Sequence, residues 1–246
     1  MKLPAKKISV DVPADWANDD LSRFLDMAWS NVFASFGLLP AQCKKSREVD
    51  DALQLLCLNL SDAGDWFAPL FAMKSHSCYR AAVGLAMAGQ SPEAFMVMRG
   101  ALESALYGLY IHKSEPALAI WMKRNDGPDE EKKMKSEFTI GNMWKCLKAA
   151  DERILGIAQA AYDKTIEFGA HPNPASVAAA VTMSKNPKGA QFKLRYLSKD
   201  IDNIGGTMKS VSQIGVTVLE IFGLVFAKRY GELGLPKKIQ ELCTGL

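Results

Sequence analysis

Residues 91–111 read SPEAFMVMRGALESALYGLYI, and this stretch decides the fold class. Apolar side chains occur nearly all round the helix that it predicts, and a helix without a polar side is buried in a bundle. Arg99 and Glu103 interrupt this apolar surface one turn apart. A buried charge is costly unless it is paired and hydrogen-bonded. The sequence therefore predicts a polar site in the middle of a helical bundle.

The composition is that of an ordinary globular protein. Of the 246 residues, 48% are hydrophobic and 23% are charged, which suits a sizeable core. The net charge is +3, and the basic residues form small groups without interleaved aromatics, which disfavours a nucleic-acid surface. The five cysteines include no Cys-x-x-Cys pair, which disfavours a zinc site or a disulfide framework. We expect a cytoplasmic location, because the first residues contain no apolar signal core.

The rest of the chain also favours helices. The predicted segments lie at about 15–36, 46–69, 71–88, 91–112, 116–125, 140–155, 156–168, 175–183 and 201–230. We expect an all-α fold, a multi-helix bundle of about seven to nine mostly antiparallel helices within a single helical domain, residues 1–246. Residues 1–13 predict a short extended leader, and the polar residues 126–136 are the candidate for a mobile connection. Residues 191–195 alternate in polarity, as a strand does.

One segment is apolar enough to require a comparison with membrane helices. Residues 211–230 are strongly apolar, but Gln213 and Glu220 lie near the middle. An acidic residue at the centre of a lipid bilayer costs roughly 3 kcal/mol. We therefore expect a buried bundle helix and no membrane contact.

The polar strip of the helix at 91–111 offers the first candidate site. At about 100° per residue, one strip contains Arg99, Glu103, Leu106 and Tyr110. Arg99 and Glu103 are four residues apart and can pair directly. Two interpretations stay open: a structural ion pair that fixes the helix register, or a pocket in which Arg99 holds Glu103 ionised. Tyr110 is a candidate ligand-binding residue on the same strip.

The preceding helix adds a histidine and an arginine. The residues that share one of its faces are His76, Arg80, Val83 and Met87. A short turn joins this helix to the next, so the two should pack antiparallel. We therefore expect His76 and Arg80 to approach the Arg99/Glu103 strip as ligand-binding residues. Alternatively, each is an ordinary surface or core residue.

A proline-rich turn presents a second histidine. Residues 169–174 read GAHPNP, and the two prolines restrict His171 and Asn173 to extended conformations. An imidazole can act near neutral pH as an acid, a base or a hydrogen-bond donor. His171 is therefore a candidate catalytic residue and Asn173 a candidate ligand-binding residue. The alternative is that the turn only breaks and caps helices.

These motifs carry a resemblance to known helical proteins. The Arg-x-x-x-Glu helix at Arg99 and Glu103, followed by the His-Pro loop at His171, resembles a group of bacterial all-helical proteins and is distantly similar to the HEPN class of helical bundles. The resemblance covers about residues 75–180, and Arg80 is a further matched position. It implies an α-helical bundle, a tendency to dimerise, and roles in phage defence or toxin–antitoxin systems. HEPN ribonucleases carry an arginine four to six residues before the histidine, whereas this chain has Lys-Thr-Ile at residues 164–166.

The sequence favours a binding or regulatory module over an enzyme. It contains no Gly-x-Gly-x-x-Gly or Walker loop, no His-Glu-x-x-His and no Gly-x-Ser-x-Gly, so no cofactor and no metal are predicted. We expect a homodimer whose polar centre holds a small ligand or a protein partner. Small residues suited to a dimer face are Gly84, Ala88, Gly205 and Gly206.

The alternative is a HEPN-like nuclease or phosphate-ester hydrolase acting on RNA. In this interpretation His171 is the acid–base group, and Arg99 or Arg80 stabilises developing negative charge. Glu103 then orients one of these three side chains.

Overall fold

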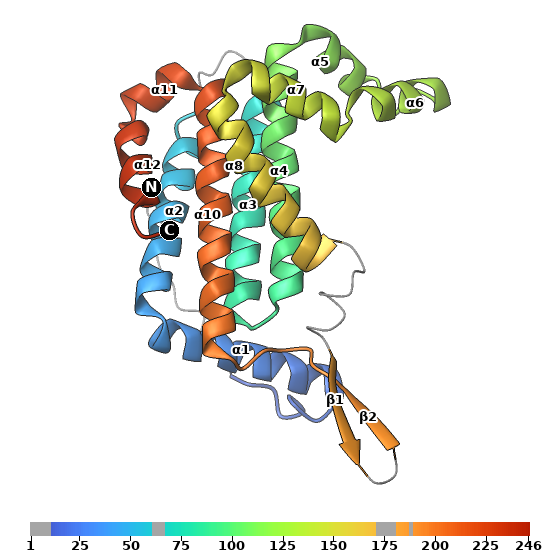
Figure 1. Cartoon of the computed structure of the whole chain (residues 1–246), viewed down its shortest axis with the longest axis vertical. Coiled ribbons are helices and arrows are strands. Elements are labelled where there is room, and N and C mark those ends of the chain that lie inside the picture. The colour runs from blue at the N-terminus through green and yellow to red at the C-terminus, as the bar shows by residue number, and fades with distance from the viewer. Residues whose placement is uncertain (1–10, 61–66, 171–180, 187–188) are drawn as a thin grey trace.

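The computed structural model describes residues 11–60, 67–170, 181–186 and 189–246 (Figure 1). These residues form eleven α-helices, one π-helical turn and one antiparallel pair of strands. The helices are α1 (Asp20–Leu38), α2 (Pro40–Cys57), α3 (Phe67–Met87), α4 (Ser91–Lys113), α5 (Glu115–Met122), α6 (Pro128–Glu137), α7 (Ile140–Ala150), α8 (Glu152–Thr165), α10 (Ile201–Val225), α11 (Ala227–Glu232) and α12 (Leu235–Cys243). The remaining elements are η1 (Ile166–Ala170), β1 (Val181–Asn186) and β2 (Gly189–Leu194). The prediction of an all-α fold is confirmed.

The described chain contains more helices than the seven to nine expected, because α6, α11 and α12 were not expected as separate helices. Asp151 separates α7 from α8, and its side chain accepts a hydrogen bond from the Ile154 amide as an N-cap. Phe226 separates α10 from α11 within the segment expected as one helix. An aspartate makes a strong N-cap because its carboxylate satisfies an amide that has no partner within the helix. The boundary expected between residues 155 and 156 is instead helix interior.

Three further expectations are corrected. Residues 128–137 form α6, so most of the expected connection at 126–136 is helical, and its three acidic residues in the first turn suit the helix dipole. Pro69 lies in the first turn of α3, where proline is tolerated, and does not end α2. Residues 181–183 belong to β1 rather than to the helix expected at 175–183, whose residues 175–180 lie outside the described chain. The expected leader falls mostly on residues 1–10, which also lie outside it.

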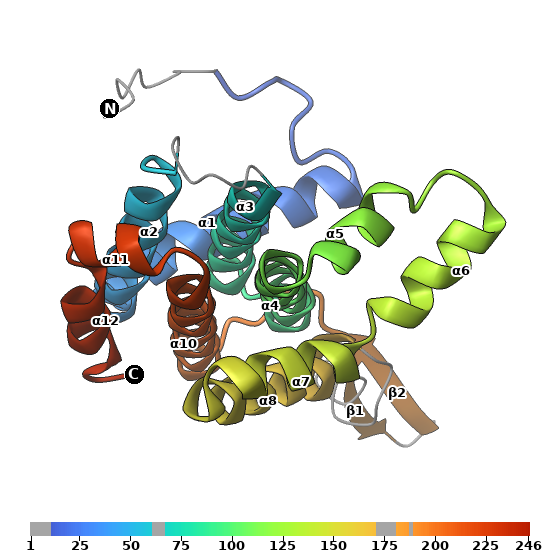
Figure 2. The ribbon, with the colours of Figure 1, turned by 90° about the horizontal axis from the view of Figure 1, so that it is seen from above.

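The core of the bundle is built around α3, α4 and α10. These three helices run side by side in both views, with α2 on one side and α8 on the other (Figures 1 and 2). Leu102, Leu106 and Phe222 are among the largest fully buried side chains. In the part of the chain that the structure describes, α10 is the one helix long and apolar enough to cross a membrane, and 72% of its most apolar window is buried inside the bundle. It therefore occupies the place expected of a core helix.

A tight turn joins α3 to α4 and brings α1 against it. Gly89 has a φ of +83°, and a Cβ atom there would lie 2.3 Å from the carbonyl oxygen of Ser198. Asn31 of α1 donates to the carbonyl oxygens of Ala88 and Ser198 at 2.9 and 3.1 Å. Ser35 donates to the Met87 carbonyl at 2.8 Å. These bonds fix α1 across the end of α3 (Figure 1).

Candidate functional site

The predicted pair on α4 is formed and is joined by a residue of α8. The Arg99 Nε donates to Glu103 Oε1 at 2.8 Å, and the Tyr162 hydroxyl donates to the same oxygen at 3.1 Å. The Arg99 guanidinium lies 5.2 Å from the centre of the Tyr162 ring, which is a cation–π contact. Burial and the neighbouring Glu103 carboxylate raise the pKa of Tyr162. Tyr162 therefore remains a hydrogen-bond donor at neutral pH.

This cluster is less buried than the sequence predicts. The Arg99 and Glu103 side chains retain 28% and 40% of their accessible surface. The polar centre that was expected to be buried is therefore only partly buried: α8 supplies Tyr162 but leaves part of this strip of α4 open to solvent. Water still solvates both charges, so breaking this pair should cost less folding free energy than breaking a fully buried one.

His76 and Arg80 meet a different partner from the one expected. His76 Nε2 lies 2.7 Å from Asp50 Oδ1. Arg80 donates from Nε to Asp50 Oδ1 at 2.7 Å and from Nη2 to Oδ2 at 2.9 Å. Both side chains therefore bind α2, whereas α4 packs on another side of α3 (Figure 2). The predicted approach of His76 and Arg80 to the Arg99/Glu103 strip is not what the structure shows.

The sequence analysis missed Asp50. The helix that carries it was expected to begin near Ser46, whereas α2 begins six residues earlier, at Pro40. The feature of the sequence that could have identified Asp50 is its position between Val49 and Leu53, which are both buried. A carboxylate next to a buried stripe needs a partner. Such a partner could only be identified by knowing which face of α3 meets α2.

The Asp50 carboxylate is held ionised. Its partial burial opposes the charge, but hydrogen bonds from His76 and Arg80 outweigh that effect and hold the pKa of Asp50 well below its usual value of 3.8. A carboxylate that accepts a bidentate guanidinium bond is also fixed in orientation. Asp50 therefore positions the Arg80 guanidinium at the surface of α3.

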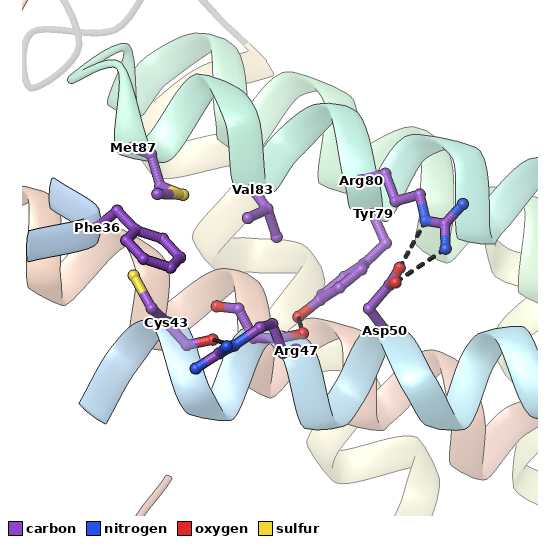
Figure 3. A pocket seen from close by; sticks show the side chains of 9 residues that line it. Phe36, Cys43, Arg47, Asp50, Tyr79, Arg80, Val83 and Met87 are labelled. Carbon is purple, nitrogen blue, oxygen red and sulfur yellow. Dashed lines mark hydrogen bonds and ion pairs between the residues drawn. The ribbon is translucent and has the colours of Figure 1, made fainter. Parts of the chain in front are cut away.

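A pocket opens beside this network, between α1, α2 and α3 (Figure 3). Its volume is about 230 Å³. The lining residues are Phe36, Cys43, Ser46, Arg47, Asp50, Tyr79, Arg80, Val83 and Met87. Five of these residues are apolar or aromatic, Ser46 is polar, and Arg47, Asp50 and Arg80 are charged. The Arg47 guanidinium lies 5.8 Å from the centre of the Phe36 ring, and its Nε donates to the Cys43 carbonyl at 3.3 Å.

The back of the pocket is rigid. The Tyr79 hydroxyl donates to the Ser46 carbonyl at 3.0 Å, and the Ser46 and Ser212 hydroxyls lie 3.2 Å apart. Tyr79 is almost wholly buried, and this burial raises its pKa far above the ordinary value. Its ring packs on Gly215 of α10, where a Cβ atom would come within 2.6 Å of the ring. The pocket wall is therefore fixed to the central helix of the bundle.

Tyr110 belongs to neither cluster. Its hydroxyl donates to the Glu137 carboxylate, and its ring meets Phe138 edge-on at 5.6 Å. Burial and the Glu137 carboxylate raise the pKa of Tyr110 to about 12. These contacts join α4 to the end of α6. The structure thus gives Tyr110 partners outside both polar clusters.

His171 and Asn173 lie outside the described residues. The chain immediately before them packs on the first turns of α4. The Phe168 ring lies 5.5 Å from the Phe95 ring, and a Cβ atom on Gly169 would come within 2.6 Å of the Pro92 carbonyl oxygen. Only a glycine fits this close approach of η1 to α4.

The described acidic, histidine and cysteine side chains do not gather into a metal site. Within residues 11–60, 67–170, 181–186 and 189–246, no group of three or more histidine, cysteine, aspartate or glutamate side chains could hold a metal ion. No family model, curated protein or solved structure matches the chain.

Proposed function

We propose that this protein is a binding module, and that the pocket between α1, α2 and α3 takes a small organic anion with an apolar body. The observation that carries this function is the pairing of an apolar wall with two guanidinium groups at its rim. Binding sites for small molecules are concave and mostly apolar, with a few polar groups that fix orientation. Phe36, Val83 and Met87 supply the apolar surface.

The charges of the lining residues favour an anion. Arg47 and Arg80 bring two positive charges, and Asp50 brings one negative charge, which Arg80 already neutralises. Among the described residues Arg47 forms no ion pair; its contacts are the Cys43 carbonyl and the Phe36 ring. A guanidinium has five N–H donors in a planar fork, so Arg47 retains donors for a carboxylate.

The volume sets the size of the ligand. About 230 Å³ holds about eight non-hydrogen atoms at the roughly 30 Å³ that each water occupies in the liquid. A six-carbon monocarboxylate such as hexanoate has this size. Hexanoate and hexylammonium are therefore a matched pair of probes, with similar apolar chains and opposite charges.

The test is the melting temperature of the whole protein with each probe, because a ligand that binds the folded state raises it. Hexanoate should raise the melting temperature and hexylammonium should not. Arg47→Gln should remove the hexanoate effect, as should Val83→Trp, which fills the pocket. Arg124→Gln is the matched control, since Arg124 also lies on an aromatic ring, Trp121, far from the pocket. Equal shifts with both probes, or a hexanoate shift retained in Arg47→Gln, would refute an anion site here.

A second function is supported by the part-exposed cluster on α4. Arg99 is solvent-accessible and is held by Glu103 and Tyr162, which suits stabilisation of developing negative charge. With His171 as acid or base, the protein would be a HEPN-like nuclease or phosphate-ester hydrolase, as the resemblance implies. Its test is cleavage of single-stranded RNA by the wild type, by His171→Ala and by Arg99→Lys. Activity that survives both substitutions would exclude this chemistry.

A further inference from the structure

The hairpin of β1 and β2 projects from the helical bundle (Figure 1). Its register pairs Val181 with Leu194 and Met183 with Phe192. Successive residues of a strand occupy opposite faces, so these four positions share one face, and all four are apolar. Positions 182, 184, 191 and 193 share the other face, and all four are polar. The hairpin is therefore amphipathic, and its four apolar positions are called the hairpin face below.

The hairpin face is open to solvent at its centre. Met183 and Phe192 retain 56% and 67% of their accessible surface, although they lie opposite each other. Single exposed apolar residues are ordinary, but two strands alone are marginally stable in water and normally pack their apolar face on another part of the protein. Tyr196, two residues after β2, is also exposed to 67%. The hairpin thus presents apolar side chains without burying them in the bundle.

The same segment concentrates positive charge. Residues 181–199 contain five basic residues and no acidic one. The whole chain has a net charge of +3, so the remaining residues sum to −2. Phe192 and Tyr196 lie within this basic group, although the basic groups of the chain were expected to lack interleaved aromatics. An anionic partner is therefore attracted to the hairpin rather than to the chain as a whole.

The acidic helix α1 offsets only part of this charge. Arg195 and Lys199 line a groove together with Asp20 and Asp26 of α1. Lys185 and Lys193 instead belong to the strands themselves, which extend away from α1 (Figure 1). The two strand lysines are therefore the positions at which the role of charge is best tested.

We infer that the hairpin binds the surface of a lipid bilayer that contains anionic lipids. Basic amphipathic helices lie in the plane of such a surface, with their apolar face at the boundary between headgroups and acyl chains. The hairpin has the same division of faces, so Met183 and Phe192 enter this boundary while the basic residues meet the anionic headgroups. Each lysine or arginine near an anionic bilayer strengthens binding about fivefold. The attachment is reversible, and the hairpin lies on the bilayer without crossing it.

The composition of the hairpin face favours a lipid over a nucleic acid. Bases of single-stranded nucleic acids stack on aromatic rings, but Phe192 is the one aromatic residue among the four positions of the face. Valine, methionine and leucine occupy the other three, and such side chains gain free energy by leaving water for an apolar medium. This contact is separate from α10, which stays within the bundle.

The test is co-sedimentation of the full chain with two kinds of vesicle: phosphatidylcholine alone, and phosphatidylcholine with roughly a third of phosphatidylserine. The wild type should bind the anionic vesicles only, with a partition coefficient that falls as the salt concentration rises. Phe192→Ser should lower this coefficient by about tenfold or more, because it removes a large apolar side chain from the boundary. The double variant Lys185→Gln/Lys193→Gln should lower it by about 25-fold, at about fivefold for each lysine. Melting temperatures should match the wild type, which separates a loss of binding from a loss of folding.

Two variants outside the hairpin are the matched controls. Phe33→Ser replaces a phenylalanine that is exposed to 74% on α1, and Lys132→Gln/Lys133→Gln removes two exposed lysines of α6. Both controls should keep wild-type binding to the anionic vesicles.

Three results would overturn the inference. The first is a wild type that binds neither kind of vesicle or binds both equally. The second is a loss of binding in the controls that equals the loss in the hairpin variants. The third is binding of a single-stranded oligonucleotide in place of the vesicles, abolished by Phe192→Ser, which would assign the hairpin to nucleic acid.

Discussion

Asp50 of α2 and His76 of α3 form a hydrogen bond of 2.7 Å that joins two consecutive helices. His76 is buried, while Arg80 covers the same carboxylate from the solvent side. One carboxylate therefore joins α2 to α3 and holds the guanidinium at the rim of the pocket. The predictions below begin with this contact.

Asp50→Ala should destabilise the protein more than any other single aspartate-to-alanine change on α2. It leaves the buried His76 without its partner, and a buried polar group left unsatisfied costs about 1–3 kcal/mol. Asp51→Ala is the control, because Asp51 is the adjacent, exposed residue and exposed positions change stability by about 0.5 kcal/mol or less. Urea unfolding of the two variants measures the difference. Similar free energies of unfolding would mean that the Asp50 contact is dispensable.

The contribution of Asp50 should depend on pH in the acid range. In the unfolded chain Asp50 takes up a proton near its usual pKa of 3.8, whereas hydrogen bonds keep the folded pKa well below that value. The unfolded state therefore binds more protons in this range, so stability falls as the pH drops below about 4. The free energy of unfolding of the wild type relative to Asp50→Asn should shrink as the pH falls from about 5 to 3. A difference that does not change with pH would contradict the depressed pKa.

Glu103→Ala should be tolerated better than a change at a sealed ion pair. The Arg99 and Glu103 side chains are 28% and 40% exposed, so we expect a cost of about 1 kcal/mol rather than the 3–5 kcal/mol of a fully buried pair. Glu131→Ala, in the exposed pair with Lys135 on α6, is the control, because an exposed pair on a helix contributes little to stability. Thermal unfolding of both variants gives the comparison. A loss of 3 kcal/mol or more in Glu103→Ala would show that the pair is structurally essential.

Two glycines of α10 should respond to alanine with opposite signs. A Cβ atom on Gly215 would come within 2.6 Å of the Tyr79 ring and 2.8 Å of Val49, and overpacking of this kind costs about 1–3 kcal/mol. A Cβ atom on Gly206 meets nothing within 4 Å, so alanine there should stabilise the helix by about 0.5–1 kcal/mol. Melting temperatures of the two variants should therefore lie on either side of the wild type. If Gly215→Ala matched Gly206→Ala, the Tyr79 ring would have to be free to move.

Periodicity was enough to predict the helical fold and the pairing on α4. Arg99 and Glu103 are four residues apart on one helix, so their contact depends only on local geometry. The start of α4 could also be predicted, because Pro92 lies in its first turn and proline is favoured there. The break at Phe226 was missed, and the break expected between residues 155 and 156 lies at Asp151, since an apolar pattern continues across a short break whatever the backbone does. Element boundaries depend on capping bonds that a pattern does not contain.

The pocket could not be predicted because it depends on which helices meet. His76 and Arg80 were identified on one face of α3, but their partner Asp50 lies 26 and 30 residues earlier in the chain. Periodicity places a residue on a face and says nothing of which neighbour covers that face. The wall of the pocket likewise combines Phe36 of α1, Cys43 of α2 and Met87 of α3. Sequence reasoning from one helix at a time misses such a site.

The most direct test of the binding function is a methyl NMR titration of the protein labelled at its eleven methionines. Met87 lines the pocket, so its methyl signal reports binding there, while the other methionines report effects elsewhere. Hexanoate should shift the Met87 signal in a saturable manner, hexylammonium should leave it in place, and Arg47→Gln should abolish the hexanoate shift. A Met87 signal that hexanoate leaves unchanged, or that both probes shift alike, would contradict an anion-binding pocket between α1, α2 and α3.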